Sequence, residues 1–174
     1  GHEAAGVILG GDRDGTRVTI NPLVHCGICG ACTTRRENLC PDRQIISMPP
    51  REGAFAQFVS MPSDNLIIVP DAVSLDHAAL AEPLAVSWHA VRLGLEALHA
   101  GADRRALVIG GGAIGLAAAL AFKAQGVAEV TIVEPNAGRR AFLQDVCGQD
   151  ATATANGQCG IVVDAVGYAA TRAT

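Results

Sequence analysis

Short apolar runs separated by turn residues dominate the first part of the chain, up to residue 73. Gly, Asp and Pro interrupt these runs, and β-branched residues are frequent within them. Such a pattern predicts short strands that curl into a barrel-like sheet, because proline confines strands to sheet edges and ends them early. The expected strands cover residues 7–9, 17–20, 45–46, 54–61 and 66–69.

The pattern becomes helical after residue 73. Ser74 is a favourable N-cap for a helix that begins at Leu75. Pro83 is expected to interrupt this helix, because proline disfavours the helical conformation of the residue that precedes it. A second helix is predicted over residues 84–99, where apolar side chains recur on one face.

The most regular pattern is a strand, turn, helix and strand within residues 106–134. Residues 106–109 form an apolar run that suits a buried strand and is too short for a helix. A glycine-containing turn follows at residues 110–115. Residues 116–125 are rich in Ala and predict a helix, and residues 130–133 predict a second strand.

The turn has glycines in the pattern G-x-G-x-x-G, and Glu134 ends the second strand. Such glycines permit a tight turn and let the backbone approach a pyrophosphate, which the N–H groups at the helix start then bind. An acid at this position accepts hydrogen bonds from both ribose hydroxyls of NAD and repels a 2′-phosphate. The arginines after it, Arg139 and Arg140, act against this preference for NAD. The expected cofactor-binding residues are Gly110, Gly112, Ala113, Ile114, Gly115, Glu134 and Arg139.

Residues 106–134 have two alternative interpretations. One is a glycine turn that serves packing alone in another kind of α/β protein. The other is a membrane span, since residues 106–122 carry no charge. That run is at the short limit for spanning a bilayer and contains the glycine turn, so we reject a membrane span.

The remaining residues continue the α/β pattern. A helix is predicted over residues 138–148, and strands over 150–155 and 161–166. Together with the two strands already described, these give about four strands of a doubly wound parallel sheet that usually has six.

Composition and charge narrow the class of protein. Of the 174 residues, 49% are hydrophobic and only 3% are aromatic, so the core is aliphatic. The net charge of −4 and a pI near 5.7 argue against nucleic-acid binding. The chain opens without a basic region or an apolar stretch of the kind that signal peptides have. We therefore expect a cytoplasmic protein with no membrane partner.

Four of the six cysteines lie close together, in the spacing C-x2-C-x2-C-x7-C. Four thiolates at this spacing suit a closed tetrahedral zinc site with a structural role. An iron–sulfur cluster is the alternative, but in bacterial ferredoxins three residues, not seven, precede the last cysteine. Cys147 and Cys159 are expected to be free thiols in a reducing compartment. The expected zinc ligands are Cys26, Cys29, Cys32 and Cys40.

Few other residues suggest chemistry by themselves. His2 and Glu3 offer an imidazole and a carboxylate side by side, which suits a divalent metal, although an exposed polar pair is the commoner meaning. Glu82 stands at the expected helix break, where a carboxylate serves as a cap or as a ligand.

Taken together, these landmarks resemble the zinc-dependent medium-chain alcohol and polyol dehydrogenases, on the side of the family that contains sorbitol, idonate and threonine dehydrogenases. The resemblance extends over nearly the whole chain. Its motifs are GHEAAG at residues 1–6, the cysteine lobe ending in Asn38-Leu39-Cys40, GAFAQF at 53–58, EPLAV at 82–86 with His89-Ala90, and the glycine turn with Glu134.

The resemblance implies a barrel-like (GroES-like) catalytic domain over residues 1–100, with a structural-zinc lobe at residues 25–41, followed by a Rossmann dinucleotide-binding domain over residues 101–174. It implies that His2 is a ligand of a catalytic zinc and that Glu3 is a second ligand or a near neighbour. Glu82 would face the same zinc. The implied reaction is hydride transfer from a secondary alcohol to NAD, in a homodimer or homotetramer.

Two parts of the family pattern are not in this sequence. One is the remaining catalytic ligand, a cysteine upstream of the His-Glu pair, and the other is the Ser or Thr that relays the alcohol proton. The chain thus resembles the middle of a dehydrogenase about twice as long, or a degenerate short relative. A non-catalytic remnant that binds zinc and nucleotide stays open as an alternative. A zinc-ribbon-like interaction module is disfavoured by the acidic charge and the glycine turn.

Overall fold

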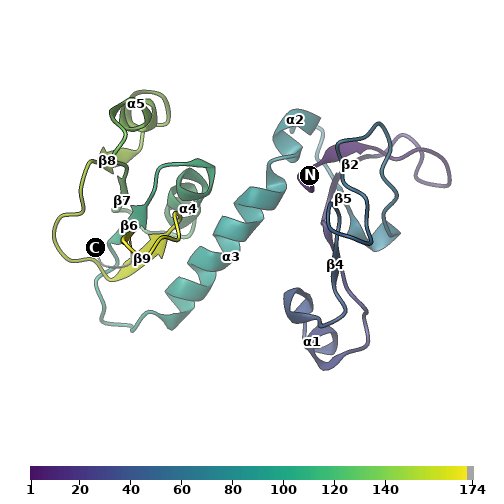
Figure 1. Cartoon of the computed structure of the whole chain (residues 1–174), viewed down its shortest axis with the longest axis horizontal. Helices are drawn as coiled ribbons and strands as arrows, with labels where there is room; N and C mark the ends of the chain where they lie inside the picture. The colour runs from purple at the N-terminus through teal and green to yellow at the C-terminus, as the bar shows by residue number, and fades with distance from the viewer. Residues whose placement is uncertain (172–174) are drawn as a thin grey trace. The chain divides into compact units, whose positions relative to one another are not determined.

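The computed structural model describes residues 1–171, so residues 172–174 of the expected second domain lie outside the described residues. The chain divides into two compact units, Gly1–Glu82 and Pro83–Thr174. Most of the long helix α3 (Ala81–Ala97) therefore belongs to the second unit (Figure 1). Gly94 in this helix shows why, since a Cβ there would lie 2.6 Å from Cδ1 of Ile161 in strand β9 (Ile161–Asp164).

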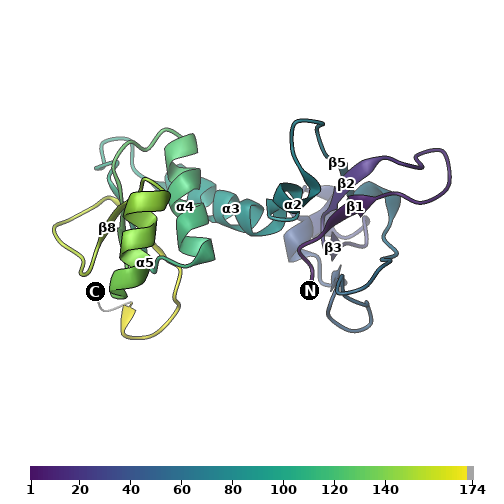
Figure 2. The ribbon, with the colours of Figure 1, turned by 90° about the horizontal axis from the view of Figure 1, so that it is seen from above.

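The first unit is built from short antiparallel strands. β1 (Ala5–Val7), β2 (Arg17–Ile20) and β5 (Leu66–Ile68) form a three-stranded sheet in the order β1-β2-β5 (Figure 2). β3 (Leu23–Val24) and β4 (Gln44–Ile45) form a separate antiparallel pair. The strands predicted near residues 17–20, 45–46 and 66–69 are thus present.

Between β3 and β4 the chain forms the cysteine lobe. It contains the short helix α1 (Gly30–Thr33) and a 3-10 turn at Glu37–Leu39. A second 3-10 turn, Ser63–Asn65, leads into β5. Helix α2 (Leu75–Ala78) follows, and the predicted cap is confirmed, because Oγ of Ser74 accepts a hydrogen bond from the backbone N–H of His77.

The prediction of a strand at residues 54–61 is wrong. Among the described residues, no ladder includes this segment, and it contains no helix or strand. A strand needs a partner to satisfy its backbone, and the side chains here gain little burial, since Phe55 is 97% exposed and Phe58 is 72% exposed. The β-like sequence pattern is therefore not sufficient to form a strand.

The predicted break between two helices is present, but it lies at residues 79–80, after α2 and before Pro83. Helix α3 starts at Ala81 and continues through Pro83 without a break. Proline is tolerated there because the N–H groups of the first turn have no partner within the helix. Glu82 consequently stands in the first turn of α3.

The second unit is a parallel sheet with helices packed on it. The strand order is β8-β7-β6-β9, with β8 at Asp150–Thr152, β7 at Val130–Val133 and β6 at Ala106–Ile109. Helix α4 (Ala113–Ala124) connects β6 to β7 in the predicted βαβ unit, and the α/β fold class is confirmed. Phe122 of α4 and Val108 and Ile132 of the sheet are fully buried in one core.

The helix predicted over residues 138–148 is present in two parts. Helix α5 (Ala137–Ala141) continues into a single π-helical turn at Phe142–Val146. Over residues 1–171, no helix is both long and apolar enough to cross a membrane.

Candidate functional site

The histidine and the two carboxylates at the start and end of the first unit converge. His2 and Glu3 precede β1, and Glu82 lies in the first turn of α3. One ligand atom from each lies within 4.8 Å of the others, and Nε2 of His2 is 3.8 Å from Oε1 of Glu82. Two ligands of a tetrahedral zinc are about 3.3 Å apart at ordinary bond lengths. Small side-chain rotations would therefore bring these three donors around one metal ion.

A buried hydroxyl connects the two segments that carry these ligands. Oγ1 of Thr19 in β2 lies 3.0 Å from the carbonyl oxygen of Ala4 and 2.9 Å from that of Ala78. Ala4 follows Glu3 directly, and Ala78 ends helix α2 shortly before Glu82. Thr19 is only 8% exposed, so its hydroxyl has little access to water, and its one hydrogen is shared between the two carbonyl oxygens of these segments.

The four cysteines of the lobe also come together. Their sulfur atoms all lie within 4.8 Å of one another, with 3.4 Å between Cys29 and Cys32 and 3.9 Å between Cys26 and Cys32. Four sulfurs at 2.3 Å from a tetrahedral zinc are about 3.8 Å apart, so this arrangement fits such an ion. Cys40 is fully buried, which is consistent with a closed site.

The thiols of the lobe differ in acidity. Hydrogen bonds from the backbone of Ile28 and Cys29 lower the pKa of Cys26 to about 7. Burial, together with the neighbouring thiols, raises the pKa of Cys32 to about 12. A metal must therefore displace at least one tightly held proton when it binds the four sulfurs.

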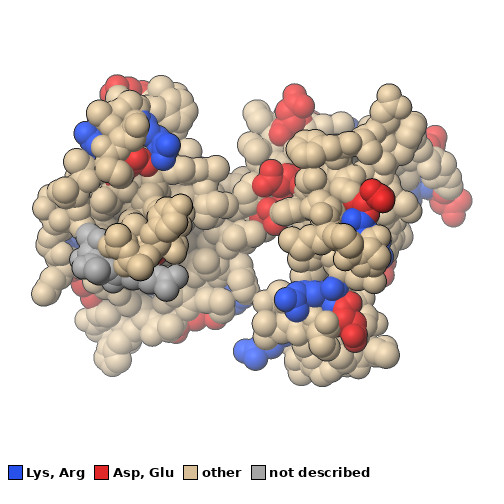
Figure 3. All heavy atoms as spheres, viewed as in Figure 1, with Lys and Arg blue, Asp and Glu red and all other residues tan. Residues whose placement is uncertain are grey.

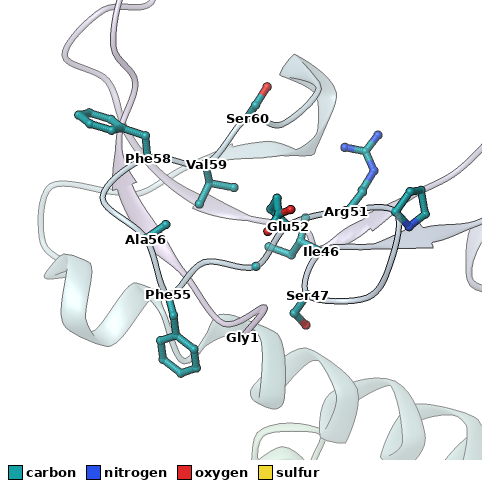
Figure 4. A pocket seen from close by; sticks show the side chains of 12 residues that line it. Gly1, Ile46, Ser47, Arg51, Glu52, Phe55, Ala56, Phe58, Val59 and Ser60 are labelled. Carbon is teal, nitrogen blue, oxygen red and sulfur yellow. The ribbon is translucent and has the colours of Figure 1, made fainter.

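A cavity of about 710 Å³ lies in the first unit beside the His2 group. Figure 4 shows Phe55, Phe58 and Val59 on one side of it, and Gly1 and Ser47 on another. Phe55 projects away from the backbone next to Gly1. The cavity is large enough for a small organic molecule.

A second cavity, of about 670 Å³, lies at the carboxyl ends of the parallel strands in the second unit. The strand order reverses here, since β7 and β9 flank β6 on opposite sides. Crevices at such a reversal are where doubly wound sheets bind dinucleotides. The lining includes Gly110, Gly112, Glu134 and Arg139, all of which the sequence predicts as cofactor-binding residues.

The glycines of the turn have three different physical roles. Gly110 has φ +95, a conformation that side chains rarely adopt. At Gly115 a Cβ would lie 1.8 Å from the carbonyl oxygen of Gly110, so only glycine lets α4 pack this closely on the turn. At Gly112, the N-cap of α4, a Cβ would meet no protein atom within 4 Å and would project into open space. The open space at a helix N-terminus fits a pyrophosphate. Ala113 and Ile114 begin the helix there.

Glu134 is bound more tightly to the protein than the sequence suggests. It is 2% exposed; Oε1 accepts from the backbone N–H of Asn136, and Oε2 accepts from Gly111 N–H and from Arg139. Burial by itself raises the pKa of Glu134, but the hydrogen bonds from Asn136, Gly111 and Arg139 outweigh burial, so the pKa lies below its ordinary value. With two acceptor sites on each oxygen, one site on Oε1 stays available for a ribose hydroxyl.

Helix α5 carries two arginines, Arg139 and Arg140. Figure 3 shows basic side chains over this helix, with acidic side chains beside them. Arg139 is half-exposed beside Glu134, whereas Arg140 donates to the backbone oxygens of Glu134 and Pro135. Of the two arginines, Arg139 is therefore the one that faces the cavity.

Sequence reasoning missed one part of this cavity. Oδ1 of Asp164, the last residue of β9, accepts from the backbone N–H groups of Val166 and Gly167, and Oδ2 accepts from the hydroxyl of Thr171. These bonds fix the loop whose Ala165, Val166 and Thr171 line the cavity. The sequence does contain a signal for this loop, because Asp164 is an acid near the end of a predicted strand and Gly167 follows it.

Comparison with known proteins agrees with this fold. Residues 1–71 match the alcohol dehydrogenase GroES-like domain. Sorbitol dehydrogenase of Bacillus subtilis is 39% identical over 140 residues, which cover 77% of this chain and 38% of that protein. L-idonate 5-dehydrogenase of Vitis vinifera is 34% identical over 86% of this chain and 42% of its own length. A crystal structure from Sinorhizobium meliloti of a protein assigned as a zinc-binding dehydrogenase, bound to NADP, has a TM-score of 0.74 at 28% identity and covers 100% of this chain and 48% of that one.

The fold and these matches define a protein of the medium-chain dehydrogenase type, with a GroES-like domain followed by a parallel α/β sheet. The chain belongs to the zinc-dependent medium-chain alcohol and polyol dehydrogenase family. It spans 38% and 42% of the length of the two curated relatives named above.

Proposed function

We propose that this chain carries the metal-binding and cofactor-binding parts of a dehydrogenase that transfers a hydride from a secondary alcohol to NAD. The observation that carries the proposal is the convergence of His2, Glu3 and Glu82, with ligand atoms within 4.8 Å, in a chain that also holds the glycine turn and Glu134. The names of the relatives, sorbitol and idonate dehydrogenases, support a polyol or a sugar acid as the substrate class.

Zinc is the metal that this donor set supports at the His2 group, where imidazole nitrogen and carboxylate oxygen are both common zinc ligands. Zinc bound there would supply Lewis-acid chemistry, lowering the pKa of the alcohol hydroxyl so that the alcohol loses its proton near neutral pH. His2 binds a metal through an unprotonated nitrogen, so we expect low pH to oppose metal binding. The 710 Å³ cavity beside His2 offers room for the alcohol.

The second unit would hold NAD. The pyrophosphate fits the open space at Gly112, where the first N–H groups of α4 have no partner within the helix. Glu134 keeps one acceptor site for a ribose hydroxyl and presents a negative charge to any 2′-phosphate. These features support NAD rather than NADP. The positive charge of Arg139 would instead favour the 2′-phosphate of NADP.

The cysteine lobe would hold a second, structural zinc. Its four sulfurs leave no coordination position for a substrate, so its role is to fix the chain between β3 and β4. We also propose a homodimer or homotetramer as the assembly.

A non-catalytic protein that binds zinc and nucleotide is the second candidate. It is favoured by the donor set of the His2 group, which has one nitrogen, two carboxylates and no thiolate. Two carboxylates neutralise the charge of a zinc ion, which weakens its action as a Lewis acid on an alcohol.

The test is NADH formation with sorbitol, idonate, galactonate and threonine. It is measured on the 174 residues of this chain and, side by side, on the whole product of the reading frame in which they are encoded. We expect turnover by the reading-frame product and none by the chain alone. His2→Gln in the reading-frame product should abolish turnover while leaving NADH binding unchanged. Tight binding of zinc and NADH without turnover by either protein would support the second candidate instead.

A further inference from the structure

The two ring nitrogens of His2 have different neighbours. Nε2 is 3.8 Å from Oε1 of Glu82, which is beyond hydrogen-bonding distance, whereas Nδ1 is 3.2 Å from Oγ of Ser47. A metal binds one nitrogen of a neutral imidazole, and the other nitrogen carries the proton. The partner of that second nitrogen therefore decides which nitrogen is free to bind a metal.

Ser47 is held in place by an unusual backbone. It follows β4 in a turn in which the N–H of Met48 donates to the oxygen of Ile45, and its own N–H donates to the oxygen of Glu52. Its φ is +73, which is uncommon for any residue other than glycine. Such conformations persist where the surrounding structure fixes them, and they are concentrated at functional sites.

The turn that carries Ser47 packs directly on the residue before His2. The N–H of Ala54 donates to the oxygen of Gly1 at 2.8 Å. A Cβ at Gly53 would lie 2.9 Å from the nitrogen of Gly1 and 3.1 Å from Cβ of Ser47, so no side chain fits between them. Figure 4 shows Ser47 beside Gly1 at the rim of the cavity. The hydroxyl of Ser47 is thus fixed relative to the His2 backbone.

We propose that Ser47 is a positioning residue for the candidate metal centre. Its Oγ accepts the hydrogen of Nδ1, which keeps the lone pair on Nε2 and turns that nitrogen toward Glu82 and Glu3. The contact holds the ring in one tautomer and one orientation before a metal arrives. The part that concerns metal affinity rests on the proposed function, and the part that concerns the tautomer does not.

The first test needs no metal. Long-range ¹H–¹⁵N NMR spectra of the metal-free chain report which ring nitrogen carries the proton, and His2→Gln identifies the signals of His2 among those of the five histidines. We expect the Nδ1–H form of His2 to predominate, and Ser47→Ala to shift His2 toward the Nε2–H form. An unchanged tautomer in Ser47→Ala would overturn the proposal.

The second test measures the affinity for Co²⁺ by its visible absorption, after the cysteine lobe has been filled with zinc. Partners of metal-bound histidines typically contribute a factor of about 10 to 100 in affinity. We expect Ser47→Ala and Ser47→Gly each to weaken Co²⁺ binding about 10-fold. Ser47→Gly relieves the backbone conformation but removes the hydroxyl, so wild-type affinity in this variant would show that only the backbone matters and would overturn the proposal.

Two controls make the outcomes distinguishable. Ser60→Ala removes the hydroxyl of an exposed serine in the same unit and should leave both the tautomer and the Co²⁺ affinity unchanged. His2→Gln should abolish Co²⁺ binding at this centre. If His2→Gln binds Co²⁺ as tightly as the wild type, the proposed metal centre is wrong, and the NMR result alone then decides the role of Ser47.

Discussion

The backbone N–H of Gly111 donates to Oε2 of Glu134 at 3.0 Å, which joins the glycine turn after β6 to the acid at the end of β7. The parallel register aligns Ile109 with Val133, so the two strands end side by side and the bond is short. Glu134 therefore stabilises the turn as well as lining the cavity. A substitution at Glu134 has consequences for stability and for cofactor binding, and the two must be measured separately.

The first prediction concerns acid stability. The folded-state pKa of Glu134 is below its ordinary value of about 4.3, so its stabilising effect is fully present above that pH and is lost as the pH falls through the folded pKa. In this range the unfolded chain binds up to one more proton at Glu134 than the folded chain does. Glu134→Gln should reduce the dependence of the unfolding free energy on pH below about pH 4.3, by at most about 1.4 kcal/mol per pH unit.

Urea unfolding at several pH values measures this dependence. Glu129→Gln is the control, because it makes the same carboxylate-to-amide change at an exposed residue directly before β7. An identical acid dependence in Glu134→Gln and the wild type would mean that the buried hydrogen bonds of Glu134 do not stabilise its charged form.

The second prediction separates two glycines of one turn. Gly115→Ala places a methyl group 1.8 Å from a backbone oxygen, so it should destabilise the second unit by about 3 kcal/mol or more. Gly112 has φ −77 and open space around its Cβ position, so Gly112→Ala should leave stability within about 1 kcal/mol. The added methyl group does occupy the space proposed for the pyrophosphate.

Gly112→Ala should accordingly weaken NADH binding by about 10-fold or more while its melting temperature stays close to that of the wild type. Fluorescence titration with NADH and thermal unfolding give the two quantities on the same samples. Full NADH affinity in Gly112→Ala would place the dinucleotide elsewhere.

Much of the second unit could be predicted because local sequence and tertiary structure agree there. The apolar runs at residues 106–109 and 130–133 are strands with those same boundaries, and a glycine turn between a strand and a helix has few other structural meanings. The cysteine lobe is equally predictable, since the spacing of its four cysteines is typical of zinc sites and its glycines let the chain fold back.

Other features depend on contacts between distant residues and leave no local pattern. The effect of Pro83 depends on which turn of the helix it occupies, and the local sequence does not show that it lies in the first turn of α3. Phe58 lies in a β-like segment that lacks a strand partner among the described residues. The contact of Ser47 with His2 joins residues far apart in the sequence, and Ser47 has a positive φ that the sequence pattern around a serine does not indicate.

The third prediction concerns the choice between NAD and NADP. Glu134→Ser removes the charge that opposes a 2′-phosphate, so the ratio of the Kd for NADP to the Kd for NAD should fall by about 10-fold. Arg139→Met removes the cation beside the same position and should raise this ratio. The Kd values for both cofactors are measured by calorimetry. A wild-type protein that already prefers NADP, or equal shifts in both variants, would contradict this role of Glu134.

The fourth prediction is that the cysteine lobe binds one zinc ion and needs it to fold. Structural zinc sites contribute about 10 kcal/mol or more of binding free energy, because the unfolded chain has no preformed site. Cys29→Ser removes one of the four sulfurs, whereas Cys147→Ser changes a free thiol outside the lobe. In a His2→Gln background, which removes the other candidate metal centre, zinc content should fall from one ion per chain to none in Cys29→Ser and stay at one in Cys147→Ser.

Because the lobe connects β3 to β4, loss of zinc should also lower the melting temperature of the first unit and leave NADH binding by the second unit intact. Iron with acid-labile sulfide in the purified wild-type protein, measured by elemental and sulfide analysis, would instead establish an iron–sulfur cluster at these four cysteines.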